Sequence, residues 1–317
     1  MTGVGNIIFM DDIFMTKNKL TNIGFPKKQG LYDSDKEHDS CGVGLIADIN
    51  NEASHDIVKK GLAMLCNLEH RGAVGADPKA GDGSGILIQI PHNFLVKEVK
   101  NINLPEKNNY GVGVFFIKKD TRVKEAIFKL IEEVCEKENV PFLGWRECPT
   151  YGDELGWSVK PTIPLVYHLF VGKPENIYHQ DDWERKIYVL RQCIDKAVAQ
   201  MGDQYYDQFY IPSFSSRTIL YKGMVLSDQV GTVGNQLGFF EDLSDPLIES
   251  SFALIHQRFS TNTFPTWSLA QPFRMLCHNG EINTVRGNIN WMNARHSILK
   301  SDKFSNCLLY TSDAADE

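Results

Sequence analysis

Several features that mark particular protein classes are missing from this sequence. Its seven cysteines form no C-x-x-C pair, the spacing typical of structural zinc sites. Five of them lie within apolar patterns, at positions 66, 135, 148, 193 and 277. We therefore expect no metal site, buried free thiols and a reducing compartment, the cytoplasm.

Long apolar runs and excess positive charge are missing too. The longest runs, residues 86–90 and 112–117, fall far short of the ~20 residues of a membrane span. Asp11 and Asp12 interrupt the only apolar stretch near the N-terminus, which argues against a signal peptide. A formal net charge of −7 is the wrong balance for a nucleic-acid surface. We expect neither a membrane nor a nucleic acid as partner.

The 317 residues show three compositional regions. Residues 1–40 are polar without helical or strand periodicity and are interpreted as a leader, with Met1 or Met15 as the start. Residues 41–306 have the patterns of a globular domain. Residues 307–317 resemble the translation of a sequencing-library adaptor, and an acidic natural tail is the alternative. The first interpretation would make the chain a fragment of a longer protein.

The periodicity of the globular region indicates strands mixed with amphipathic helices. Ser54 is a good N-cap for a helix. Further helices are predicted around residues 123–134, 183–201 and 285–299. Strands are predicted at residues 42–49, 86–90, 111–117, 165–171, 217–221 and 252–258. This order favours antiparallel sheets layered with helices over a doubly wound parallel sheet.

Four segments carry residues suited to chemistry: SCGVG at 40–44, LEHRG at 68–72, RFST at 258–261 and HNGE at 278–281. Each has an ordinary structural interpretation when taken alone. A cysteine among glycines is usually a small core residue, and Asn-Gly is a common hairpin turn. Arg71 could form a surface ion pair. Arg258 follows an apolar strand and so stands at a strand end.

Taken together and in this order, the segments resemble the class II glutamine amidotransferases, which are N-terminal-nucleophile hydrolases. Within that family the chain is most similar to the glutaminase domain of glutamate synthases. The resemblance runs from about residue 30 to 298 and is dense over residues 256–295. It implies an α+β fold, a four-layer αββα sandwich with two antiparallel sheets, and L-glutamine as substrate.

The resemblance also implies a nucleophile and an oxyanion hole. Cys41 would be the first residue of the mature chain after removal of residues 1–40. Its free α-amine, with a pKa of about 7.7–8.0, could then take the thiol proton. The Asn279 side chain and the Gly280 backbone N–H would stabilise the oxyanion.

Substrate recognition follows from the same resemblance. Arg258 would bind the α-carboxylate of glutamine as a bidentate fork, and Thr261 would hold the same end of the substrate. Arg71 would order the surroundings of Cys41. Residues 259–266 would form a loop that closes over glutamine. The aspartate that binds the substrate ammonium in the family would lie beyond residue 317.

Cofactors and partners are also implied only by the resemblance. No cofactor is expected in this chain. The full-length enzyme would add a synthase domain that aminates 2-oxoglutarate with FMN and an iron–sulfur cluster, served by a small NADPH-oxidising subunit or by ferredoxin. Two alternatives stay open: another class II enzyme, such as one similar to amidophosphoribosyltransferase, and a non-catalytic interaction domain.

Two further patterns are assigned structural roles. The glycine-rich run 81–85 precedes a predicted strand rather than a helix, which favours a tight turn over a phosphate-binding loop. His70 and His278 flank motif residues without metal-ligand spacing, so we predict that both are structural.

Overall fold

The chain divides into two units, Met1–Ser40 and Cys41–Glu317. Of the first unit, only residues 28–31 are described. In the second unit, the computed structural model describes residues 42–69, 72, 76–234, 236–257, 265–278 and 285–296. All that follows concerns the second unit.

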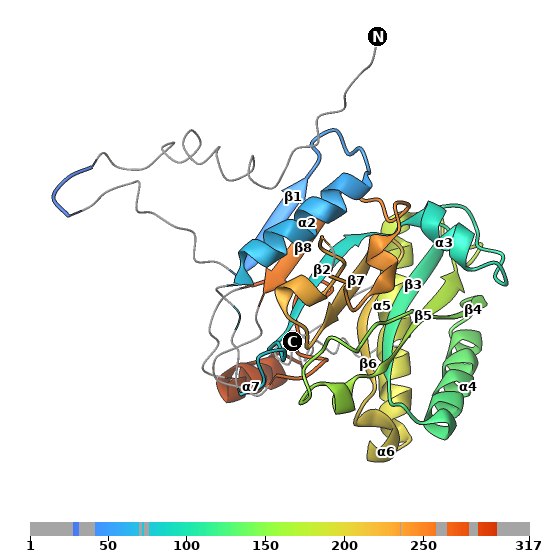
Figure 1. Ribbon diagram of the computed structural model, residues 1–317. Helices are drawn as coiled ribbons and strands as arrows, with labels where there is room; N and C mark the ends of the chain where they lie inside the picture. Colours follow the sequence, from blue (N-terminus) through green and yellow to red (C-terminus); the bar gives the residue numbers. More distant parts are fainter. Residues whose placement is uncertain are drawn as a thin grey trace, which may run out of the picture. The chain divides into compact units, whose positions relative to one another are not determined.

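Two four-stranded sheets form the centre of this unit (Figure 1). One has the order β1-β8-β2-β7 and the other β4-β5-β3-β6, and every strand pair is antiparallel. The strands of the first sheet are β1 (Val43–Ala47), β2 (Ser84–Gln89), β7 (Thr218–Gly223) and β8 (Phe252–Gln257). Those of the second are β3 (Tyr110–Ile117), β4 (Phe142–Glu147), β5 (Leu165–Gly172) and β6 (Tyr210–Ser215). Only residues 216 and 217 separate β6 from β7, so one tight connection joins the two sheets.

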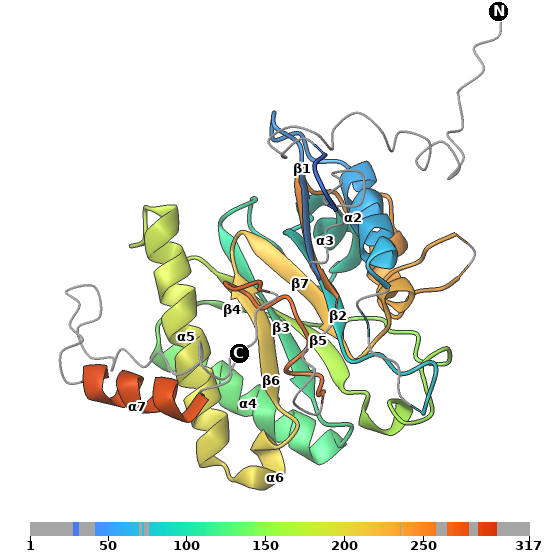
Figure 2. The same cartoon turned by 90° about the vertical axis from the view of Figure 1, so that its left-hand side faces the viewer.

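Helices lie on both outer sides of the strands. In Figure 2, α2 and α3 lie on one side of the strands, and α4 and α5 on the other. The described helices are α2 (His55–Asn67), α3 (His92–Glu98), α4 (Thr121–Lys137), α5 (Gln180–Gln200), α6 (Asp203–Tyr206) and α7 (Val285–His296). Short 3₁₀ helices occur at η3 (Lys160–Thr162), η4 (Ser227–Gln229) and η5 (Glu241–Ser244). The predicted αββα arrangement with two antiparallel sheets is confirmed.

Local sequence explains why the helices begin and pack where they do. The Ser54 side chain accepts a hydrogen bond from the backbone N–H of Ile57, as expected for an N-cap. Asp120 caps α4 in the same way. The buried residues of α4 and α5 recur at spacings of three and four and pack against the β4-β5-β3-β6 sheet. A second core joins α2 to residues of both sheets.

Two strands were missed by the sequence prediction, β4 and β6. Pro212 lies inside β6, and a proline argues against a central strand because it cannot donate to the sheet. The structure places β6 at the edge of its sheet, where one side of the strand needs no partner. The other predicted strands and helices are confirmed, with ends shifted by a few residues; residues 258 and 297–299 lie outside the described part.

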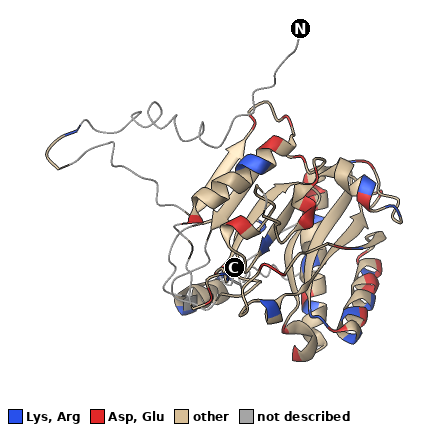
Figure 3. Cartoon of the chain, viewed as in Figure 1, with Lys and Arg blue, Asp and Glu red and all other residues tan. Residues whose placement is uncertain are grey.

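The distribution of charge agrees with this layering. Figure 3 shows positive and negative residues interspersed on the helices, with few on the strands. None of the helices in the described part is both long and apolar enough to cross a lipid bilayer.

Candidate active site

The residues predicted to perform the chemistry lie outside the described part of the chain. They are Cys41, Arg71, Arg258, Thr261, Asn279 and Gly280, and their roles remain predictions. A direct sequence neighbour is described for each of the four segments: Gly42, Gly72, Gln257 and His278. The geometry of these neighbours shows which parts of the chain the fold brings together.

The first and third segments meet where β1 begins and β8 ends. The two strands pair in register from Val43 opposite His256 to Ala47 opposite Phe252. One step further along, the backbone N–H of Gln257 donates to the carbonyl oxygen of Gly42 at 2.7 Å. The bond joins the residue after Cys41 to the residue before Arg258.

The second segment reaches the same point. Gly72 lies against the Gln257 side chain, since a β-carbon at position 72 would be only 2.5 Å from its Nε2 atom. A β-carbon at this position would therefore force the end of the Gln257 side chain to move. The backbone N–H of Gly72 donates to the carbonyl oxygen of Glu69 at 2.8 Å, which turns the chain just after α2.

The fourth segment is joined to β8 through a buried histidine. His256 is 1% exposed, and its Nε2 lies 2.6 Å from the carbonyl oxygen of His278. A carbonyl oxygen only accepts, so the ring nitrogen donates and carries the proton. This bond uses only the backbone of His278, so the structural role predicted for its side chain stays a prediction, and His70 lies outside the described residues. All four segments thus have described neighbours at one end of the β1–β8 pair.

Three buried or half-buried cysteines, Cys66, Cys135 and Cys148, are poor nucleophiles. Burial raises the pKa of the Cys66 thiol to about 11 and that of Cys135 to about 12, with the nearby negative charges of Asp228 and Glu132 adding to the respective effects. Burial next to Asp242 raises the pKa of Cys148 as well. The thiolate is the reactive form, so these three thiols are unreactive at neutral pH. None of them competes with Cys41 for the role of nucleophile.

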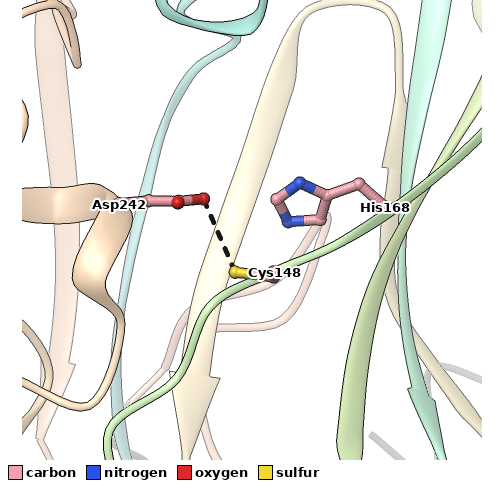
Figure 4. Close-up of side chains that lie close together, drawn as sticks. All are labelled: Cys148, His168 and Asp242. Atoms are coloured by element: carbon pink, nitrogen blue, oxygen red, sulfur yellow. Dashed lines mark hydrogen bonds between the residues drawn. The ribbon is translucent and has the colours of Figure 1, made fainter. Parts of the chain in front are cut away.

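A second group of chemically capable side chains lies elsewhere in the fold. Cys148, His168 and Asp242 point toward one another (Figure 4), and their potential ligand atoms lie within 4.8 Å of one another. The Cys148 thiol donates to Oδ2 of Asp242 at 3.5 Å. His168 comes from β5 and Asp242 from η5, and all three residues are buried. Residue types and distances alone would suit a metal ion.

Arg146 shows that this group is an ion-pair network. Its guanidinium donates to both carboxylate oxygens of Asp242, at 2.8 and 2.7 Å, and to Nδ1 of His168 at 3.3 Å. The Tyr221 hydroxyl donates to the same carboxylate at 3.3 Å. The atoms that would bind a cation are thus already occupied by a buried cation, so these residues do not fit a metal.

The sequence analysis did not predict this ion-pair network, because no local sequence pattern indicates it. Arg146, His168 and Asp242 lie in three elements separated by long stretches of chain. Burial, with the positive charge of Arg146 adding to it, lowers the pKa of His168 to about 4, so its imidazole is neutral. Among the described residues, Cys148, His168 and Asp242 are the only group of three or more potential metal ligands. It contains a single cysteine and therefore does not fit an iron–sulfur cluster.

Comparison with known proteins agrees with the family that the four segments resemble. The sequence model of the class II glutamine amidotransferases matches residues 41–312. The chain is 46% identical to the large chain of NADPH glutamate synthase from Bacillus subtilis over 290 residues, which is 92% of this chain and 18% of that protein. It is 40% identical to chloroplastic ferredoxin-dependent glutamate synthase 2 of Arabidopsis thaliana over 280 residues, 87% of this chain and 16% of that protein.

A third relative, the NADH glutamate synthase of Saccharomyces cerevisiae, is 42% identical over 292 residues, 88% of this chain and 13% of that protein. The chain thus spans less than a fifth of the length of these relatives. All three are glutamate synthases, which does not favour the amidophosphoribosyltransferase-like alternative. The chain belongs to the class II glutamine amidotransferases.

Proposed function

We propose that this chain is the glutaminase part of a glutamate synthase and that it hydrolyses L-glutamine to glutamate and ammonia. The observation that carries the proposal is the meeting of Gly42, Gly72, Gln257 and His278 at one end of the β1–β8 pair. Consecutive α-carbons are only about 3.8 Å apart. The neighbours of these residues, among them Cys41, Arg258 and Asn279, are therefore candidates for one site.

In this proposal Cys41 attacks the amide carbon of the glutamine side chain. Removal of residues 1–40 frees the α-amine of Cys41, which takes the thiol proton and later returns it to the departing ammonia. A peptide nitrogen at this position could do neither.

The oxyanion of the tetrahedral intermediate needs fixed hydrogen-bond donors. We assign this role to the side-chain amide of Asn279 and the backbone N–H of Gly280. Loss of one such donor typically costs about 2.7–4 kcal/mol of barrier. After ammonia leaves, water hydrolyses the thioester and glutamate is released.

The charged end of glutamine also needs partners. Arg258 follows β8 directly and offers a planar fork to the α-carboxylate. Thr261 holds the same end, and residues 259–266 close over the substrate. Arg71, next to Gly72, orders the surroundings of Cys41.

The rest of the proposed enzyme belongs to the longer protein. Ammonia would pass to a synthase domain that aminates 2-oxoglutarate with FMN and an iron–sulfur cluster. The relatives are named for NADPH, NADH and ferredoxin, so a small NADPH-oxidising subunit and ferredoxin both remain candidate partners. Cys66, Cys135 and Cys148 are free thiols, which supports a reducing compartment such as the cytoplasm.

The experiment that tests this function is active-site labelling. The chain is incubated with an electrophilic glutamine analogue, and the adduct is located by mass spectrometry, which also reports the mature N-terminal residue. We expect labelling at Cys41, protection by L-glutamine and a chain that begins at Cys41. A Cys41→Ala variant should not label, and a Cys66→Ala variant, the matched control, should label normally. Labelling that does not depend on Cys41 would contradict the proposal and favour a non-catalytic interaction domain.

A further inference from the structure

Three residues form a row across the β1-β8-β2-β7 sheet. Gly85 of β2 pairs with Lys222 of β7 on one side and with His256 of β8 on the other. Directly paired residues share a face of a sheet. Lys222 is fully buried and His256 is 1% exposed. The row therefore places two buried polar side chains on either side of a glycine.

Each member of the row contacts the segment that leads to Asn279. Lys222 donates from Nζ to the carbonyl oxygen of Ser268 at 2.8 Å. Its ammonium also lies over the rings of Tyr210 and Phe273, 4.9 and 4.6 Å from their centres. This end of the row fixes where the segment begins to cross the sheet.

Gly85 provides space for the middle of the segment. A β-carbon at position 85 would lie 2.9 Å from the carbonyl oxygen of Gln271 and 2.6 Å from the β-carbon of Lys222. Glycine is thus required for the backbone of Gln271 to approach the sheet. The buried side chain of Gln271 in turn accepts a long hydrogen bond, 3.5 Å, from the N–H of His278. The glycine-rich run 81–85 thereby gains a role beyond the tight turn that the sequence predicts.

His256 completes the row at the point nearest the chemistry. Its Nε2–H donates to the carbonyl oxygen of His278 at 2.6 Å. That oxygen belongs to the same planar peptide group as the nitrogen of Asn279. A bond to this oxygen therefore restrains the orientation of the peptide from which Asn279 extends.

We propose that His256 is a positioning residue for the oxyanion hole and that it acts through the His278–Asn279 peptide. The proposal rests on the function proposed above. In this proposal His256 holds the carbonyl group that precedes Asn279 at a fixed place relative to β8, and Arg258 follows β8 in the sequence. The same strand would then support both the oxyanion donors and the fork proposed to bind the substrate carboxylate.

This role makes a kinetic prediction that general destabilisation does not make. Oxyanion donors act in the transition state more than in the ground state, so their displacement lowers kcat and leaves KM nearly unchanged. Misplacement of a reacting group by about 1 Å can cost ~100-fold in rate. We expect His256→Leu to lower kcat about 10- to 100-fold with KM within about twofold of wild type.

The experiment compares four variants with the wild-type protein after mass spectrometry has verified that each begins at Cys41. His256→Leu removes the donor, and His256→Asn offers an amide that is too short to reach the His278 carbonyl oxygen. His256→Gln can place an N–H near the position of Nε2 and should restore most of kcat. The matched control is His92→Leu, because His92 hydrogen-bonds to the Tyr110 hydroxyl at 3.0 Å beyond the other end of β2. This control should leave both kcat and KM unchanged.

The outcomes separate the inference from the function on which it rests. Unchanged kcat in the folded Leu or Asn variant overturns the inference while the glutaminase stands. So does a Gln variant no better than Leu, or a fall in kcat accompanied by a large rise in KM, because either result indicates a general structural role. If His256→Leu does not fold, the contrast between Asn and Gln decides. A wild-type protein that neither labels at Cys41 nor hydrolyses glutamine overturns the proposed function itself.

Discussion

The two faces of the β4-β5-β3-β6 sheet both pack into apolar cores, but one of them also carries a buried ion-pair network. Along β5, Leu169 and Val171 join the apolar core under α4 and α5. Directly before Leu169 in the sequence, His168 faces the other way and meets Arg146, Asp242 and Tyr221. The face under α4 and α5 is stabilised by burial of hydrocarbon. The other face combines such burial, at Val166 and Phe170, with a buried ion pair that must be complete to be tolerated. Substitutions at neighbouring residues of one strand can therefore destabilise the protein for different physical reasons.

The largest expected effect comes from breaking the ion pair. Arg146→Met leaves the Asp242 carboxylate, whose side chain is 1% exposed, without its cation. We expect the free energy of unfolding in urea to fall by about 3–5 kcal/mol. The double variant Arg146→Met/Asp242→Leu replaces both charges with hydrocarbon and should recover most of this loss. A double variant as unstable as the single one would contradict the comparison of the two faces.

On the face under α4 and α5, we expect Leu169→Ala to lower the free energy of unfolding by about 2–5 kcal/mol. Leu169 is fully buried, so its truncation leaves a cavity in the helix-covered core. Urea unfolding at several pH values should give the same loss throughout, because no titrating group is involved. A loss of stability that varies strongly with pH would contradict the view that hydrocarbon burial alone stabilises this face.

His168 gives the face that carries the ion pair a pH dependence of its own. Its folded-state pKa of about 4 lies below the ordinary value of 6.5 because the ring is buried. Between these values the unfolded chain binds more protons than the folded one, so stability falls as pH falls from about 6.5 to about 4. The slope from this single group is at most about 1.4 kcal/mol per pH unit.

The test compares unfolding free energies of the wild type and His168→Gln across this range. The carboxylates that titrate at low pH contribute to both proteins, so the difference between the two curves isolates His168. We expect the wild type to lose stability more steeply than the variant. Parallel curves would mean that His168 is protonated in the folded protein as readily as in the unfolded one.

The smallest effect is expected at the edge of the apolar face, where Asp120 caps α4. Its carboxylate accepts hydrogen bonds from the N–H groups of Arg122 and Val123 at 2.9 and 3.2 Å. Asp120→Ala should cost about 1 kcal/mol in thermal or urea unfolding. Glu125→Ala, on the exposed side of the same helix, is the control and should stay within about 0.5 kcal/mol of wild type.

The sequence predicts the apolar packing of this sheet far better than its ion-pair network. The buried residues of α4 and α5 repeat every three or four positions, and β3 and β5 are continuous apolar runs, so local pattern suffices. The edge strand β6 was missed because Pro212 argues against a strand and only the sheet order shows why it is tolerated. The network of Arg146, His168 and Asp242 could not be predicted, because its members meet only after three distant elements have packed.

The candidate active site is an intermediate case. The four segments were found because their order and amino-acid sequences resemble those of a family. The fold shows that their described neighbours converge at one end of the β1–β8 pair. The bond from His256 to His278 has no signal in the sequence, since a buried histidine and a backbone carbonyl can come from any two segments. The residues proposed to perform the chemistry were therefore easier to find than those proposed to hold them in place.

The two-residue connection between β6 and β7 limits how this protein can vary. Side chains alternate between the two faces of a strand, so one residue inserted or deleted at positions 216–217 would move every β7 side chain to the opposite face unless the turn absorbed it. Lys222 would then leave the rings of Tyr210 and Phe273 and lose the carbonyl oxygen of Ser268. Natural variants of this domain should therefore differ in the length of many loops but keep the length of this one.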